Sequence, residues 1–453
     1  MSEFGGLNIG RSALYAHRRA LDVTGHNLAN VNTPGYSRQR VELTADAGPT
    51  KAAIFSNWDG GGQGVRAGDL TRITDRFLEA RGLQEHATDA NLTQAKTVMN
   101  NIELAVAEPS DTGLGSQINQ FMSAWDDLAN QPDNMAARSQ LVEQAKTLTA
   151  GFALLDGTMA SLASSSTNEL SATVADINTI ASQVAGLNNQ IRGSVTQGLP
   201  SADLMDQRDL LVQQLSQLAG VTVRQQDDGV VDVYLGSASL VRGDKASPLS
   251  IDNTSTPGTV NVKIDALGVT VPLDGKAGAL QTAVNVTIPS YRSQLTAVAQ
   301  KLNDEVNAMH TTGFDLNGAA GQAFFQMGPT GIQVNPVIAN DPTKIAVAAT
   351  ATALRDGSVA NKIAQLNGAG GLYNTMVQRL GVESQTINRK STIQSGIVQQ
   401  VDAARDAASG VNIDEEMTNM ISIQHAYDAA ARFITAVDSM LETLIKGTGL
   451  VGR

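Results

Sequence analysis

Residues 413–444 read IDEEMTNMISIQHAYDAAARFITAVDSMLETL and carry the most regular hydrophobic pattern in the chain. Apolar side chains recur every seven residues in two rows offset by three positions, which is the spacing of a coiled-coil seam. Acidic residues fill the first turn, where the helix dipole stabilises negative charge. The pattern predicts one helix, roughly 50 Å long at about 1.5 Å per residue, whose seam contacts other helices. The rows, which form a candidate assembly interface, are Ile413, Met420, Tyr427, Ile434 and Leu441, and Ile423, Ala430, Val437 and Leu444.

The beginning of the chain has a related pattern, with a leucine at every seventh position. This spacing favours a coiled-coil helix or, as an open alternative, an amphipathic helix lying on a globular core. Residues 1–40 contain five arginines and two acidic residues, whereas residues 402–453 contain four basic and eight acidic residues. Both ends of the chain are therefore coiled-coil-like, and opposite charges help two helices to select each other, so we expect residues 1–40 to pair with residues 405–453. The N-terminal row consists of Leu7, Leu14, Leu21 and Leu28.

A turn interrupts the N-terminal pattern at residues 30–36. Pro34 fixes φ and Gly35 can adopt positive φ, so the pair predicts a turn that redirects the chain out of the first helix. An ordinary surface turn without further role is the alternative. The candidate residues of this turn are Asn30, Asn32, Pro34, Gly35 and Tyr36.

Between the two ends, helical and extended patterns alternate. Residues 41–70 are rich in glycine and predict extended chain and loops. Residues 135–192 have apolar residues seven apart, with one step of eight from Leu162 to Leu170, which favours a very long bundled helix. The expected fold is mainly α, an elongated helical bundle and coiled coil built from both termini. It contains a helical rod domain of residues 41–220 and 288–404 and a small β-rich domain inserted at residues 221–287.

Composition argues against several classes of function. The 453 residues carry a formal net charge of −12 and only 4% aromatic residues, so we expect no nucleic-acid partner. Cysteine is absent, which removes disulfides and thiolate chemistry. The N-terminus lacks the basic and apolar regions of a cleaved signal peptide, and no uninterrupted apolar stretch predicts a membrane span. The five histidines show no metal-ligand spacing and no catalytic motif is found, so we expect no enzyme, cofactor or metal site.

Four stretches resemble known proteins. Residues 24–39, TGHNLANVNTPGYSRQ, resemble the N-terminal signature of the bacterial flagellar axial proteins, which include rod, hook and hook-associated subunits. The other three resemble the family of flagellar hook-associated protein 1 and follow in order along nearly the whole chain. They are residues 204–223 (LMDQRDLLVQQLSQLAGVTV), 313–325 (GFDLNGAAGQAFF) and 409–444.

The resemblance implies a structural subunit of the flagellum at the junction between hook and filament. In such proteins the two terminal helices pair in the inner layer of a helical assembly, a helical rod surrounds it, and β-rich material projects outward. The implied partners are further copies in a helical ring, the flagellar hook protein, the adjacent hook-associated junction protein and an export chaperone on the C-terminal helix. The implied route is unfolded export through the type III apparatus to the cell exterior.

Two alternatives remain at this stage. One is a sibling hook or rod subunit, which the DQRD and GFDLNG segments disfavour. The other is a coiled-coil secreted adhesin, which would not need the ANVNTPGY turn together with a C-terminal heptad helix.

Overall fold

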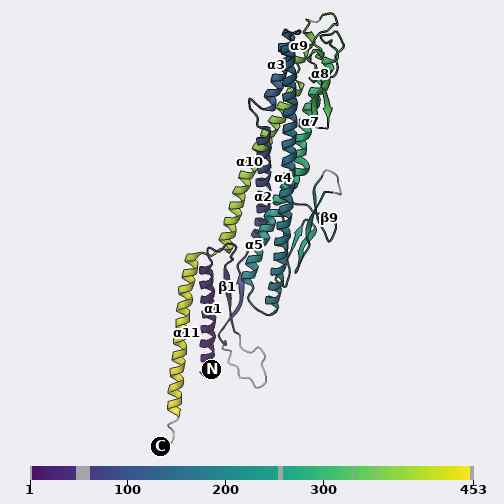
Figure 1. The fold of residues 1–453 in the computed structure, drawn as a ribbon. Helices are drawn as coiled ribbons and strands as arrows, with labels where there is room; N and C mark the ends of the chain where they lie inside the picture. Colours follow the sequence, from purple (N-terminus) through teal and green to yellow (C-terminus); the bar gives the residue numbers. More distant parts are fainter. Residues whose placement is uncertain (1–2, 47–61, 254–258, 330, 354, 449–453) are drawn as a thin grey trace.

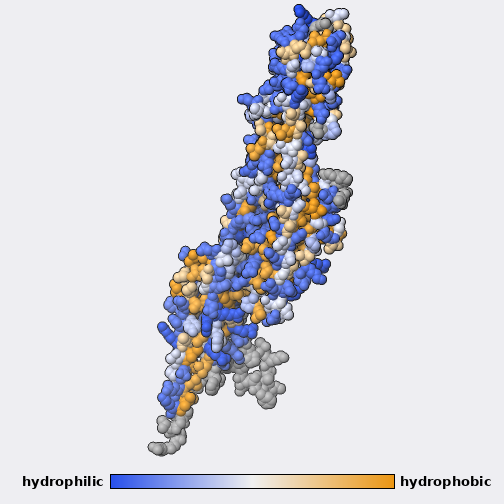
Figure 2. Space-filling view, viewed as in Figure 1, coloured by the Kyte–Doolittle hydropathy of each residue, from blue (hydrophilic) through white to orange (hydrophobic). Residues whose placement is uncertain are grey.

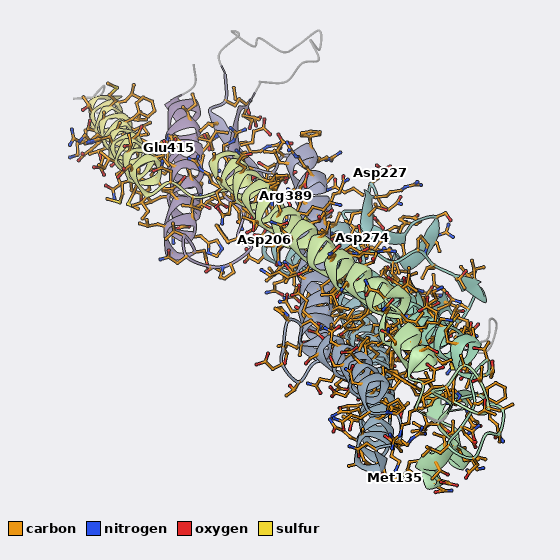
Figure 3. All side chains as sticks on the ribbon, turned by 90° about the horizontal axis from the view of Figure 1, so that it is seen from above. Met135, Asp206, Asp227, Asp274, Arg389 and Glu415 are labelled. Carbon is orange, nitrogen blue, oxygen red and sulfur yellow. The ribbon has the colours of Figure 1, made fainter. Side chains whose placement is uncertain are left out.

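The computed structural model describes residues 3–46, 62–253, 259–329, 331–353 and 355–448. The molecule is elongated, and both chain ends lie at the same end of it (Figure 1). A view from above places Glu415 and Met135 toward opposite ends (Figure 3). The prediction of a mainly helical, elongated fold is confirmed. The helices are α1 (Glu3–Ala29), α2 (Arg76–Val106), α3 (Leu114–Asn130), α4 (Met135–Thr196), α5 (Ala202–Ala219), α6 (Gly275–Thr282), α7 (Ile288–His310), α8 (Pro336–Asn340), α9 (Ser358–Ala364), α10 (Gly368–Ser409) and α11 (Ile413–Thr448), with a π-helical turn at Ala283–Thr287 and a 3-10 turn at Pro342–Lys344.

The long helix α4 connects two hydrophobic cores. Its N-cap is Asn134, whose side chain accepts hydrogen bonds from the backbone N–H groups of Ala136 and Ala137. The eight-residue step from Leu162 to Leu170 falls between the two cores. One added residue rotates the apolar face by about 100°, so the two halves of the helix face different partners. Helix α4 gives Leu141, Leu148, Leu155 and Met159 to the first core and Leu170, Ile177 and Val184 to the second.

The predicted β-rich insert is present as two small antiparallel sheets. Two asparagines of α4 hold them, because Asn188 bonds both backbone groups of Val231 and Asn178 bonds both backbone groups of Leu249. One sheet has the order β3-β4-β5-β6 and the other β7-β8-β9. The strands are β3 (Thr222–Gln225), β4 (Val231–Leu235), β5 (Ala238–Arg242), β6 (Lys245–Ala246), β7 (Leu249–Asp252), β8 (Asn261–Ile264) and β9 (Val269–Thr270).

The predicted boundary of this insert differs from the structure. Residues 275–287 are not strand but form α6 and the π-helical turn. Asp274 caps α6 by accepting from the Gly275 N–H. Ala277 and Leu280 lie three residues apart and are fully buried in the second core, which is the period of a helix rather than of a strand. The strands therefore occupy only residues 222–270.

A hairpin pairs the chain segments on either side of the glycine-rich region. Strand β1 (Gln39–Ala45) pairs antiparallel with β2 (Val65–Arg72), with Gln39 opposite Arg72. The sequence predicted extended chain here but not this pairing, because the register depends on contacts with α1 rather than on a short turn. The middle of the predicted loop, residues 47–61, lies outside the described residues. A second hairpin, β10 (Phe325–Gly328) with β11 (Gly331–Val334), lies beside α4 and α7.

A buried histidine lies at the end of the rod far from the chain termini. His310 packs edge-on against Trp125 and Phe324. Its Nε2 accepts from the Ala346 N–H at 2.8 Å, which leaves Nδ1–H to donate to the Gln322 carbonyl. Burial lowers the pKa of His310 from 6.5 to about 4, so the ring is neutral at pH 7. The residue therefore belongs to the core and to no candidate site.

Candidate assembly interface

The first and last helices lie side by side, as predicted, and they are antiparallel (Figure 1). Two glycines one helical turn apart on α1 allow the close approach. A Cβ placed on Gly10 would lie 2.5 Å from Cγ1 of Ile434, and one on Gly6 would lie 3.4 Å from Cγ2 of Val437. Ile434 and Val437 of the predicted seam therefore contact α1. The glycine pair was not among the residues singled out from the sequence, although its GxxxG spacing could have suggested it.

The predicted seam residues divide into two groups. Ten of them are partly buried and three are exposed. Ile413, Tyr427 and Leu444 are 49%, 37% and 48% exposed. The partly buried residues are Leu7, Leu14, Leu21 and Leu28 on α1 and Met420, Ile423, Ala430, Ile434, Val437 and Leu441 on α11.

A second apolar stripe on α11 lies beside the predicted seam. Phe433 and Met440 occupy the position before the seam row of Ile434 and Leu441, and they are 44% and 67% exposed. Ile445, at 68% exposed, extends the stripe toward the C-terminus. Figure 2 shows hydrophobic surface on this end of the molecule. Analysis of seam positions alone missed these residues, because a two-row heptad reading ignores the flanking positions.

The predicted turn adopts the predicted backbone. Gly35 has φ of 78°, and a Cβ there would lie 3.4 Å from Cβ of Leu210 on α5. Asn30 closes the end of α1, because its Nδ2 donates to the His26 carbonyl and its Oδ1 accepts from Thr33. Asn32 and Pro34 are exposed and make no side-chain hydrogen bond within the described chain. The turn is therefore not an ordinary surface turn, because Asn30 contacts α1 and Gly35 contacts α5.

Asn27, which the sequence reading did not single out, is the centre of the turn's hydrogen bonding. Its side chain is buried, and its Oδ1 accepts from the Tyr36 hydroxyl at 2.8 Å and from the Gln39 N–H at 3.0 Å. Its Nδ2 donates to the Gln39 carbonyl at 2.9 Å and to Oε2 of Glu416 at 3.1 Å. Burial, with Asp203 and further carboxylates, raises the pKa of Tyr36, so its hydroxyl stays protonated and donates. One amide thus joins α1, the turn, β1 and α11.

Arg38 makes the charged contact between the two ends of the chain. Its Nε donates to Oε1 of Glu416 at 2.7 Å, and its Nη1 donates to Oε2 of Glu415 at 2.8 Å. Its backbone N–H donates to the Ser409 carbonyl at the end of α10. The acidic first turn of α11 therefore has a specific partner as well as the helix dipole. Asn412 caps that helix by accepting from the N–H groups of Asp414 and Glu415.

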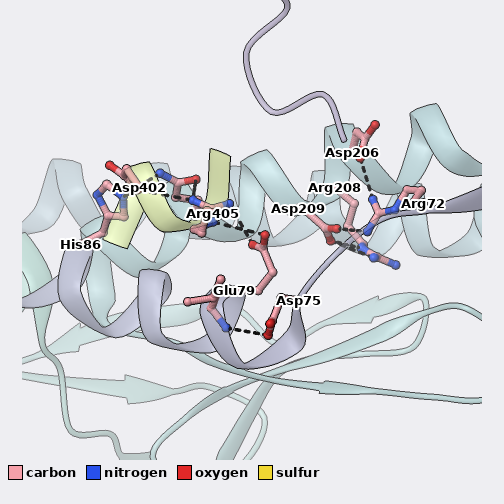
Figure 4. Close-up of polar contacts among 11 residues, drawn as sticks. Arg72, Asp75, Glu79, His86, Asp206, Arg208, Asp209, Asp402 and Arg405 are labelled. Carbon is pink, nitrogen blue, oxygen red and sulfur yellow. Dashed lines mark hydrogen bonds and ion pairs between the residues drawn. The ribbon is translucent and has the colours of Figure 1, made fainter. Parts of the chain in front are cut away.

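A second charged cluster fixes the hairpin to α5. Arg72 of β2 donates to Asp206 at 2.8 Å and to Asp209 at 2.6 Å (Figure 4). Asp206 also accepts from the Ser37 N–H in the turn. Burial raises the pKa of Asp206, and the Arg72 charge opposes this effect. The TPGYSRQ and DQRD segments, more than 160 positions apart, are therefore direct partners. Their sequences gave no sign of that contact.

Polar contacts continue from this joint along α2 and α10. Arg405 donates to Glu79 at 2.8 Å, and His86 lies 2.9 Å from Asp402 (Figure 4). Gln394 donates to the carbonyl of Glu85. The lower part of α10, which leads to α11, is thus attached to the rod largely by ion pairs and hydrogen bonds. Such contacts orient α10 against the rod but contribute little to the free energy of folding.

The described residues contain no group of three or more histidine or acidic side chains placed to hold a metal ion. None of the helices in this part of the chain is long and apolar enough to cross a membrane.

Comparison with known proteins identifies the family. The model of the "Flagellar hook-associated protein FlgK helical domain" matches residues 99–325. The "Flagella basal body rod protein" model matches residues 7–36, and the "Flagellar basal body rod FlgEFG protein C-terminal" model matches residues 405–446. The last two cover only the chain ends, whereas the helical-domain match distinguishes this chain from rod and hook subunits.

Full-length relatives agree with the domain matches. Flagellar hook-associated protein 1 of Bacillus subtilis (strain 168) is 30% identical, with all of both chains covered. Its namesake in Salmonella typhimurium is 26% identical over 97% of this chain and 99% of the relative. The solved structure of the flagellar hook junction protein FlgK from Burkholderia pseudomallei aligns with a TM-score of 0.50 and 26% identity, over 55% of this chain and 47% of that chain. The chain therefore belongs to the family of flagellar hook-associated protein 1 (FlgK), and it is a structural subunit of the bacterial flagellum at the junction of hook and filament.

Proposed function

We propose that this subunit assembles through its paired terminal helices, with copies packed side by side in a helical ring. Residues 1–40 and 405–453 form the inner layer, and residues 41–220 and 288–404 form a rod around it. The β-rich part projects outward. Its bounds, predicted as residues 221–287, are taken here as residues 222–270, which contain the strands. The signature turn at residues 30–36 holds the inner layer at a fixed angle to the rod.

One observation carries this proposal: the pair of α1 and α11 is packed closely near the beginning of α1 yet incompletely covered. Gly6 and Gly10 bring the helices together, while Phe433, Met440 and Leu444 stay exposed. A monomer that exposes a run of large apolar side chains on one helix presents an interaction surface. Neighbouring copies cover that surface in the assembled ring.

The remaining partners follow from the position in the flagellum. The ring contacts the flagellar hook protein on one side and the adjacent hook-associated junction protein on the other, outside the cell. Before export through the type III apparatus, a cytoplasmic chaperone holds α11. An exposed amphipathic helix suits a partner with a hydrophobic groove, and the seam row of Ile434 and Leu441 is the contact while α11 is not yet paired with α1.

The test is a double substitution on α11, Ile434→Asp with Leu441→Asp. Both side chains are partly buried against the N-terminal helix or its surroundings, so two carboxylates there prevent helix pairing. We expect a soluble protein with a folded rod that no longer binds its chaperone or retains filaments, so that filament subunits leak into the medium. Asp438→Ala, on an exposed flank of the same helix, is the matched control and should retain both properties. Normal filaments on cells that carry the double variant would refute the proposed role of α11.

A further inference from the structure

Two hollows on the terminal helix pair carry opposite charge. The first, termed the basic hollow, lies between α1 and β2 and has a volume of about 510 Å³. Its charged side chains are Arg18, Arg19 and Arg66 against the single acidic residue Asp22. Tyr15, which is 68% exposed, lies at the same hollow. The basic hollow therefore combines a net positive charge with an exposed aromatic ring.

The second hollow, termed the acidic hollow, lies at the joint between α10 and α11 and has a volume of about 600 Å³. Asp406, Asp414 and Glu415 line it, and Arg38 is its single basic residue. Figure 3 places Glu415 at the beginning of α11. Val411 and the half-exposed Ile413 supply apolar surface among these charges. The acidic hollow thus combines a net negative charge with apolar surface, and its charge is opposite to that of the basic hollow.

Most charges of the two hollows have no ion-pair partner among the described residues. Arg18, Arg19 and Arg66 form no ion pair with any residue in the described ranges, and the same holds for Asp406 and Asp414. Arg38 is engaged with Glu415 and Glu416. Charged groups that a fold leaves without partners are available to steer and orient an approaching molecule.

The register of the helix pair prevents the two hollows of one chain from meeting. Gly10 lies level with Ile434, and Asn27 lies level with Glu416. In this antiparallel register Arg19 is level with Gln424, ten residues beyond Asp414. At about 1.5 Å per residue, the two hollows are about 15 Å apart along the helices. A contact between them therefore requires two chains.

We propose that the basic hollow of one copy docks on the acidic hollow of the next copy, a contact that rests on the function proposed above. Arg18 and Arg19 face Asp406 and Asp414 of the neighbour, and Tyr15 packs against its Ile413. Because the two surfaces share no residue, each copy uses one to bind forward and the other to bind backward. A head-to-tail contact of this kind, with its axial offset, builds a ring or a helix rather than a closed pair.

Disulfide trapping tests the contact directly, because the chain contains no cysteine of its own. We expect the variant carrying Arg19→Cys and Asp414→Cys to form a ladder of dimers and larger species when isolated flagella are oxidised. The 15 Å axial offset, taken at about 1.5 Å per residue, is too long for a disulfide within one chain, which spans at most about 7 Å between Cα atoms. Each single-cysteine variant should give no ladder. Arg19→Cys with Asp438→Cys is the matched control, because Asp438 is exposed on α11 far from the acidic hollow.

Charge reversal supplies a second, independent readout. Arg18→Glu with Arg19→Glu, and separately Asp406→Lys with Asp414→Lys, should each lower the fraction of cells bearing filaments at least tenfold. The four changes together should restore it, while circular dichroism of each purified variant shows a rod as stable as the parent. Equal ladders from the two cysteine pairs, or reversal variants that assemble normally, would overturn the proposal.

The outcomes also separate this contact from the function on which it rests. A cross-link from Arg19→Cys to a different flagellar protein would overturn the choice of a second copy as the occupant, while leaving the junction role intact. Absence of the parent protein from isolated flagella would instead refute the proposed function itself.

Discussion

Nδ2 of Asn27 donates to Oε2 of Glu416 at 3.1 Å, although the two residues are 389 positions apart. Both side chains are almost completely buried, and the same amide also bonds both backbone groups of Gln39. The side chain of Asn27 therefore connects the first helix to the strand after the turn and to the last helix. The angle between the terminal helix pair and the rod depends on this contact and on Arg72 with Asp206.

Replacement of the central amide should loosen that joint. Asn27→Asp removes the donor and places a second carboxylate against Glu416, and a buried group left without its partner costs about 1–3 kcal/mol. In isolated flagella we expect faster amide hydrogen exchange in residues 30–41 and 409–416 and unchanged exchange in α4, and on cells we expect fewer attached filaments. Asn32→Asp, on the exposed part of the same turn, is the control and should change neither measurement.

A side chain larger than hydrogen at Gly10 should prevent α1 from pairing with α11. A Cβ at Gly10 lies 2.5 Å from Ile434, so Gly10→Ala forces α1 and α11 apart even though alanine favours a helix. We expect loss of filament attachment with an unchanged melting temperature for the rod. Gly25→Ala on the same helix meets nothing within 4 Å and should assemble as well as the parent. Equal assembly by both variants would show that the close approach is dispensable.

At Gly35, the effect of backbone strain can be separated from the effect of crowding against Leu210. Gly35→Val combines a positive φ of 78° with crowding against Leu210 and should impair assembly while the central helices stay folded. Gly198→Val has a similar φ of 68° but nothing within 4 Å, so it carries the strain alone. Motility assays and circular dichroism of both variants distinguish the effects. Normal motility with Gly35→Val would mean that the turn only connects two elements.

The terminal helices should be weakly protected in a dilute monomer. Among the described side chains of α11, Glu416 is the only one that is fully buried, so the helix has little packing to hold it. Hydrogen exchange followed by mass spectrometry should show residues 1–35 and 410–453 exchanging fast and the helices of 75–220 exchanging slowly. Strong protection of both ends in the monomer would mean that the pair is already stable before assembly.

Acid should destabilise the far end of the rod through His310. Its pKa is lowered to about 4, so between pH 6.5 and 4 the unfolded chain binds a proton that the folded chain does not. The free energy of unfolding therefore falls as pH decreases through this range, by about 3 kcal/mol in total. His310→Gln removes the titration and should flatten the pH dependence measured by urea unfolding, at some cost in stability at pH 8.

Local periodicity was sufficient to predict most of the helices and the seam positions that are covered. The row from Leu141 to Ile191 is buried except at Leu162, which is partly buried beside the first core. Ile434 and Val437 contact α1 because apolar residues at heptad spacing share one face of a helix. The error at residues 275–287 arose where apolar and small residues are close together and helix and strand periods are hard to separate.

What the sequence determined by itself is the set of properties that depend on neighbouring residues: helix lengths, apolar faces, the turn at Pro34 and Gly35, and the motifs of a flagellar hook-associated protein. Only the tertiary structure decided which distant polar groups meet. Asn27 with Glu416, Ser37 with Asp206, and the two charged hollows are brought into place by the short link at residues 410–412 between α10 and α11 and by the contact of α5 with the hairpin. The physical reason is that a hydrogen bond or ion pair depends on position in space to within a few tenths of an ångström, and no local repeat encodes that position.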